Sequence, residues 1–117
     1  MTKGQIEARI SEAMSKFEVE YMGRGPEKIR TNIVHDMIII RLKGFLSVSE
    51  KNLASTKEGV ELIKQHRRAL FENAQTQLIE TVQSVLNIQF ISVHSDVSTV
   101  TGEKIIVLIA DKDIETE

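Results

Sequence analysis

Residues 60–86, from Val60 to Leu86, have the sequence VELIKQHRRALFENAQTQLIETVQSVL, and this stretch decides the fold. It contains neither glycine nor proline, and its apolar residues recur at spacings of three and four, which predicts one long amphipathic helix. Its apolar positions are Val60, Ile63, Leu70, Phe71, Ala74, Leu78, Val82 and Val85. Such a helix is roughly 40 Å long, whereas a compact domain of this size is only about 34 Å across. We therefore expect the apolar stripe to extend past the chain's own sheet, where a second copy of the chain covers it.

The composition fits a single domain over residues 1–117 and excludes several classes of protein. Acidic residues outnumber basic ones, 17 to 15, so no net basic field favours nucleic-acid binding. The absence of cysteine excludes a disulfide framework and a cysteine-rich zinc site. The first residues are polar, and no apolar run approaches the ~20 residues of a membrane span. We therefore expect a cytoplasmic protein with no direct membrane insertion.

The remaining sequence predicts a helix and two strands before the long helix, and two strands after it. Thr2 and Gln5 have the spacing of a capping box at the start of the first helix, and the glycines and proline of residues 23–26 end it. Strands are expected over residues 28–35, 37–44, 88–97 and 105–110. A short helical segment is expected over 47–56, separated from the long helix by Gly59, and a frayed acidic tail over 111–117. The last strand is apolar on both faces, so we place it centrally. The predicted fold is α+β, with a four-stranded, mainly antiparallel sheet and both helices on one face.

Alternation along the strands predicts which side chains point away from the helices. In the second strand, Ile38, Ile40 and Leu42 share the inner face. The outer face is expected to carry Arg30, Asn32, Arg41, Lys43, Ser92, His94 and Asp96.

The segment Gly23-Arg24-Gly25-Pro26, followed by Lys28 and Arg30, is the strongest candidate for a ligand-binding loop. Glycines let backbone N–H groups converge on an anion, and an arginine offers a bidentate fork for phosphate or carboxylate. The same residues also fit a simple turn from helix to strand, in which glycine takes positive φ and proline fixes the exit.

His94 and Asp96 lie two residues apart on one strand face, where they could act as a general acid and base or as two metal ligands. A metal would need further ligands, for which His35 and Asp36 are the candidates. The alternative is a solvated strand face on which both side chains hydrogen-bond to each other or to neighbouring hydroxyls. We predict no metal site and no cofactor.

Arg67 interrupts the apolar stripe of the long helix. A buried arginine is costly unless it is paired, so we expect either a carboxylate from a second subunit or a bound anion. Alternatively, its aliphatic stem covers apolar surface while its guanidinium stays in water.

Several blocks of residues also carry a resemblance to a known family. They are MGRGPEKIR (residues 22–30), HDMIIIRLKG (35–44), LASTKEG (53–59), RRALFENA (67–74), and SVHSDVS (92–98) with TGE (101–103). Together they resemble the MpsC-like, or YbcI-type, family of small bacterial proteins, over about residues 6–114. The resemblance implies a role beside membrane systems for cation translocation or inorganic-carbon uptake, and it implies no catalytic residue.

From the residues and the resemblance we expect a non-enzymatic homo-oligomer, a dimer through the helix at residues 60–86. Its expected role is that of an accessory or regulatory protein of a membrane cation or inorganic-carbon transport system, held at the inner membrane through that partner. A different hypothesis is a small-anion or nucleotide-binding sensor that uses residues 23–30 and Arg67. A third is a hydrolase or lyase that uses His94 and Asp96.

Overall fold

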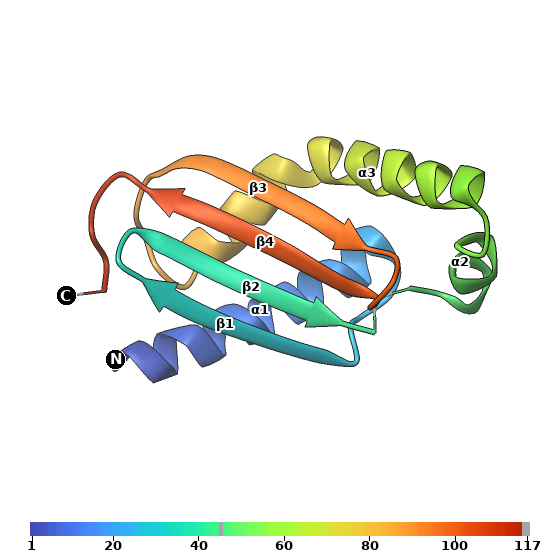
Figure 1. Cartoon of the computed structure of the whole chain (residues 1–117). Helices are drawn as coiled ribbons and strands as arrows, with labels where there is room; N and C mark the ends of the chain where they lie inside the picture. The colour runs from blue at the N-terminus through green and yellow to red at the C-terminus, as the bar shows by residue number, and fades with distance from the viewer. Residues whose placement is uncertain (45, 116–117) are drawn as a thin grey trace.

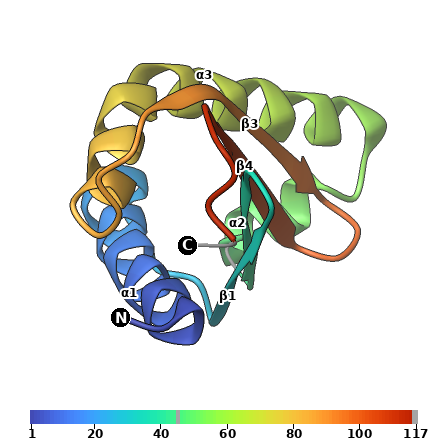
Figure 2. The same cartoon turned by 90° about the vertical axis from the view of Figure 1, so that its left-hand side faces the viewer.

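The computed structural model describes residues 1–44 and 46–115, which form three helices and one four-stranded sheet. The elements are α1 (Lys3–Met22), β1 (Lys28–Val34), β2 (Met37–Lys43), α2 (Val48–Leu53), α3 (Lys57–Gln83), β3 (Phe90–Ser98) and β4 (Glu103–Ala110). The strand order is β1-β2-β4-β3, and every neighbouring pair is antiparallel. Helices α1 and α3 lie on the same side of the sheet (Figures 1 and 2). The predicted α+β class and element order are confirmed.

Helix α1 begins and ends as its sequence predicts. The Thr2 side chain accepts a hydrogen bond from the Gln5 backbone N–H, and the Gln5 side chain accepts one from Thr2 N–H, which completes the capping box. At the other end Gly23 adopts the left-handed conformation with φ of 82°, which ends the helix without the strain that a side chain would impose there. The inner face of α1 buries Ile10, Met14 and Phe17 in the core.

The helices cover one face of the sheet and leave the other face open. Ile38, Ile40 and Leu42 of β2 are fully buried beneath the helices, and β4 lies centrally between β2 and β3, as predicted. The outer face carries the polar residues expected from the alternation, because Arg30, Arg41, Asp96 and their neighbours are exposed. Figure 1 views this open face, with the helices behind the strands.

The prediction for the long helix was wrong by three residues at both ends. Helix α3 spans Lys57–Gln83, 27 residues, because the Thr56 side chain accepts a hydrogen bond from Gly59 N–H and starts the helix there. Gly59 therefore lies inside the first turn of α3 and does not separate it from the short helix. The predicted short helical segment is confirmed as α2.

The chain itself covers most of the apolar stripe of α3. Phe71, Ala74, Leu78 and Val82 pack in the main core, and Ile63 packs against Leu46 and Val97 in a second cluster. These clusters lie along an elongated molecule with a longest dimension of 46 Å. A second copy of the chain is therefore not needed to cover these positions. Self-association stays a prediction.

The expectation of a frayed tail was wrong for its first residues. Ile114 is buried in the main core, and its N–H donates to the carbonyl oxygen of His35. The Glu115 carboxylate accepts a hydrogen bond from Lys3 and another from His35 N–H. An apolar side chain and a carboxylate with two donors thus anchor a segment whose composition suggested fraying, while residues 116–117 lie outside the described part.

Within the described residues, no helix combines the length and hydropathy that a membrane span requires.

Candidate functional site

The residues singled out from the sequence lie in three places. Gly23, Arg24 and Gly25 follow α1, whereas Lys28 and Arg30 lie on the open sheet face. Arg67, His94 and Asp96 line a cleft between α3 and β3. The structure therefore separates the predicted loop from Arg67, and it brings Arg67 together with the pair on β3.

Arg24, in the loop after α1, hydrogen-bonds to the connection between β2 and α2. The Arg24 guanidinium donates to the carbonyl oxygens of Leu46 at 2.9 Å and Gly44 at 3.4 Å, so it fastens the connection between β2 and α2. Gly25 lies close to α1, since a Cβ at this position would be 3.2 Å from Cγ2 of Val19. These contacts favour the interpretation of residues 23–26 as a turn.

Four cations form a cluster on the open face that we call the basic quartet: Lys28, Arg30, Arg41 and Lys43. The register places Lys28 opposite Lys43 and Arg30 opposite Arg41, so like charges meet directly across β1 and β2. Such pairs destabilise a sheet. These residues line a depression of about 440 Å³.

Among the described residues, one member of the basic quartet has an ion-pair partner. Arg41 binds the Glu103 carboxylate at 2.8 Å from Nη2 and 3.1 Å from Nε. The side chains of Lys28, Arg30 and Lys43 have no hydrogen-bond or ion-pair partner among residues 1–44 and 46–115. The surplus of positive charge makes this depression attractive to an anionic group.

An apolar row runs beside the basic quartet along β2 and β4. It consists of Met37, Ile39, Ile105, Val107 and Ile109. Ile105 is 37% exposed and pairs with Arg41 in the register, so the apolar row and the basic quartet are contiguous. Sequence reasoning recognised β4 as apolar on both faces and placed both helices on one face of the sheet, but it did not assign the apolar side chains of β4 to the open face.

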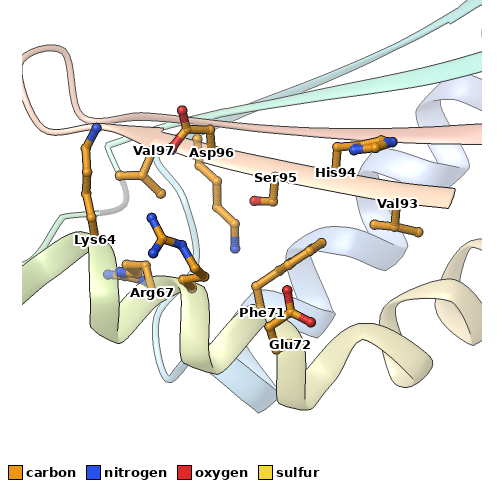
Figure 3. Close-up of a pocket in the computed structure, with 11 residues that line it drawn as sticks. Lys64, Arg67, Phe71, Glu72, Val93, His94, Ser95, Asp96 and Val97 are labelled. Atoms are coloured by element: carbon orange, nitrogen blue, oxygen red, sulfur yellow. The ribbon is translucent and has the colours of Figure 1, made fainter.

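The cleft between α3 and β3 has a volume of about 260 Å³ and contains four cationic side chains: Lys64, Arg67, Arg68 and Lys104. Figure 3 shows Val93, Ser95 and Val97 on the side of β3 that faces α3, while Asp96 points the other way. This alternation lets one strand contribute both to the cleft and to the open sheet face.

Two ion pairs anchor cations of this cleft. Lys104 Nζ lies 2.9 Å from Glu18 Oε1, and both side chains are only 3% exposed. The Arg67 guanidinium binds the Glu50 carboxylate through Nη2 at 2.7 Å and Nε at 3.1 Å. The carboxylate partner of Arg67 thus comes from α2 of the same chain, and the expectation of a carboxylate from a second subunit was wrong.

The Glu50 carboxylate has a shifted pKa. Burial acts to raise its pKa, but the hydrogen bond from Arg67, the one from Ser47 N–H and the Arg67 charge outweigh burial and lower it. Glu50 also belongs to the capping box of α2, in which its backbone N–H donates to the Ser47 hydroxyl. Glu50 therefore joins the start of α2 to the middle of α3.

His94 and Asp96 contact neighbouring groups of their own strand. His94 Nε2 lies 3.1 Å from Ser92 Oγ, and Asp96 Oδ1 accepts a hydrogen bond of 2.8 Å from Val97 N–H. Within the described residues, no group of three or more histidine and carboxylate side chains could hold a metal ion. The geometry resembles a solvated strand face more than an acid–base pair.

Sequence reasoning missed Glu18, Ser95 and Lys104. A signal was present for Lys104, because it shares the inward parity of Ile106, Leu108 and Ala110 in β4. A charge at an inward position predicts a buried partner. Glu18 carried a similar signal, because it follows Ile10 and Met14 at helical spacing on the buried face of α1.

Comparison with known proteins places the chain in a family. Residues 2–112 match the sequence model of a family described as Na+-translocating membrane potential-generating system (MpsC). The chain belongs to the MpsC family. This confirms the resemblance seen in the motif blocks, and the family description links the chain to a membrane-potential system.

Two curated relatives of this MpsC-family protein come from Bacillus subtilis (strain 168). Uncharacterized protein YbcI is 37% identical over 114 residues, which cover 97% of this chain and 92% of the relative. Uncharacterized protein YrhF is 28% identical over 109 residues, 92% of this chain and 89% of the relative. No solved structure matches the chain.

Proposed function

We propose that this protein is a non-enzymatic, cytoplasmic accessory or regulatory protein of a membrane cation or inorganic-carbon transport system. The family description supports the association with a membrane system. The observation that carries the proposal is the open sheet face, on which the basic quartet adjoins the apolar row. This face is the docking surface for a transport protein.

The occupant that fits this surface is an acidic segment with apolar side chains from the cytoplasmic part of the transport protein. Its carboxylates would neutralise Lys28, Arg30 and Lys43, which lack partners among the described residues, and relieve the like-charge pairs. Its apolar side chains would cover Ile39 and Ile105.

The size of the face favours a transient complex. Four strands spaced by about 4.8 Å, with roughly seven residues each, give a footprint of about 400–500 Å². This is at the low end for specific complexes and is typical of transient signalling contacts. A regulator that associates and dissociates fits these dimensions better than a permanent subunit does.

Affinity purification from gently solubilised native membranes, followed by mass spectrometry, tests the proposal. We expect the tagged wild-type protein to bring down a membrane transport protein, and the variant Arg30→Glu/Lys43→Glu to lose it. The matched control is Arg9→Glu/Lys16→Glu, which makes the same charge change on the exposed surface of α1. Equal recovery with both double variants, or recovery of no transport protein by the wild type, would overturn the proposal.

The small-anion or nucleotide-binding sensor is the second candidate, and the basic quartet favours it too. Lys28 and Arg30 belong to that depression, whereas Arg24 contacts backbone carbonyls. Thermal melting of the purified protein with pyrophosphate distinguishes the two functions. A rise in melting temperature that Arg30→Glu/Lys43→Glu abolishes, without any transport protein in the purification, would favour the sensor.

A further inference from the structure

The cleft between α3 and β3 contains a buried cation with unused hydrogen-bonding capacity. The Lys104 side chain is 3% exposed, yet it lines this cleft. An ammonium has three N–H donors. The structure gives Lys104 one acceptor among the described residues, Glu18 Oε1. Two donors of a desolvated charge are thus left without a protein acceptor, which is costly unless another group accepts them.

A second polar group and an apolar wall share the cleft with Lys104. The Ser95 side chain projects from β3 toward α3 (Figure 3), and its hydroxyl has no hydrogen-bond partner among the described residues. Phe71, Val93 and Val97 supply the apolar lining. A few convergent polar groups against apolar side chains are typical of a small-molecule site.

The charged side chains around the cleft limit the net charge that a ligand can carry. Glu18 and Glu50 already bind Lys104 and Arg67, so both of these cations are balanced. At the rim, Lys64 and Arg68 are matched in number by Glu72 and Asp96. The cleft thus carries no surplus positive charge. Of the possible anions, a single carboxylate held by the unused Lys104 donors therefore leaves less uncompensated charge than a dianion does.

We propose that this cleft binds a small monocarboxylate with a short aliphatic chain. Its carboxylate accepts hydrogen bonds from the Lys104 ammonium and the Ser95 hydroxyl, and its chain lies against Phe71, Val93 and Val97. The volume of about 260 Å³ far exceeds that of one water molecule, which occupies ~30 Å³ in the liquid, so a small organic anion has room. This site is separate from the basic quartet, so it does not depend on the proposed function.

Titration of the purified protein with sodium butyrate, followed by backbone amide resonances, tests the proposal. We expect saturable shifts at Ser95 and Phe71, with sodium chloride at equal ionic strength as the reference. Shifts that do not saturate, or that chloride reproduces, would reduce the site to non-specific ion binding and overturn the proposal. Saturation by inorganic phosphate but not by butyrate would overturn the assignment of a monocarboxylate.

Two variants locate the bound carboxylate. Ser95→Ala removes one hydrogen bond to a charged group, so we expect butyrate affinity to fall about tenfold. The matched control is Ser92→Ala, which removes a hydroxyl that contacts His94 instead. Unchanged affinity in Ser95→Ala would contradict its role in the site.

The role of Lys104 needs a variant that keeps the fold. Lys104→Met alone leaves the buried Glu18 unpaired, so Glu18→Leu/Lys104→Met, which removes both charges, is the informative protein. We expect this double variant to keep a dispersed amide spectrum and to lose saturable butyrate binding. Wild-type affinity in the folded double variant would overturn the proposal.

Discussion

Glu18 and Lys104, 86 residues apart in the sequence, form an ion pair between α1 and β4. The distance between Oε1 and Nζ is 2.9 Å, and each side chain is 3% exposed. Removing two charges from water costs several kcal/mol each, and their mutual attraction offsets that cost only while both are present. Breaking the pair by removing one partner is therefore costly, whereas replacing both residues by apolar ones costs little.

This pairing predicts that single and double substitutions behave differently. We expect Glu18→Leu or Lys104→Met to lower the free energy of unfolding by about 3–5 kcal/mol, because each leaves an unpaired buried charge. Glu18→Leu/Lys104→Met is expected to recover most of this loss. Urea denaturation measures the four proteins of the cycle. Additive losses in the double variant would show that the two side chains act independently.

The ion pair between Glu50 and Arg67 predicts a pH dependence at the end of the molecule where α2 lies. The pKa of Glu50 is lowered in the folded protein, so the stability it contributes is present above its unfolded pKa and is lost as the pH falls through its folded pKa. We expect Glu50→Gln to lower the melting temperature at neutral pH. This difference should shrink below the ordinary glutamate value of 4.5.

Melting curves of the wild type and Glu50→Gln between about pH 3 and pH 7 check this prediction. Glu58→Gln is the control, because Glu58 is exposed in the first turn of α3 and has no side-chain partner among the described residues. A constant difference between the wild type and Glu50→Gln across this range would contradict the link to ionisation of Glu50.

The sequence contained enough information for the fold and only part of the site. Strand alternation and the Thr2 capping box are local signals, so the elements and the faces of β2 were predictable. The start of α3 was missed because Gly59 looked like a break, whereas the Thr56 cap lies just before it. The pairing of Glu18 with Lys104 was not predictable, since it depends on how α1 is placed over β4.

The basic quartet was predictable in part. Strand alternation already placed Arg30, Arg41 and Lys43 on the outer face, but it did not pair the residues of the two strands. The structure pairs Lys28 with Lys43 and Arg30 with Arg41. Because the turn between β1 and β2 is short, its length sets this register, and the pairs could have been derived from it.

Gly59 provides a test of the packing between α2 and α3. A Cβ at Gly59 would lie 1.7 Å from the carbonyl oxygen of Leu53, a backbone atom that cannot easily move. We expect Gly59→Ala to lower the free energy of unfolding by about 1–3 kcal/mol. Gly4→Ala is the matched control in α1, where a Cβ meets nothing within 4 Å. Equal effects of both substitutions in urea denaturation would contradict the close approach.

The basic quartet predicts that one substitution stabilises the protein while weakening its binding to the proposed transport protein. Arg30 faces Arg41 across β1 and β2, so Arg30→Thr removes a like-charge pair and introduces a residue that favours strands. We expect the free energy of unfolding to rise by about 0.2–1 kcal/mol, with less gain at high salt. Arg41→Thr is the comparison, since it also breaks the contact with Glu103. Loss of stability in Arg30→Thr would show that the repulsion is already relieved within the chain.

Self-association through α3 predicts which apolar side chain a dimer needs. Because the inner stripe is covered, the large apolar residues left exposed on α2 and α3 are Val48, Leu53 and Leu62. We expect light scattering at high micromolar concentration to give a dimer mass, and Leu62→Glu to give a monomer. Ile105→Glu places the same charge on the open sheet face and should leave the dimer intact if α3 forms the contact. A monomer mass for the wild type would refute self-association. Dissociation by Ile105→Glu alone would show that the dimer contact lies on the open sheet face.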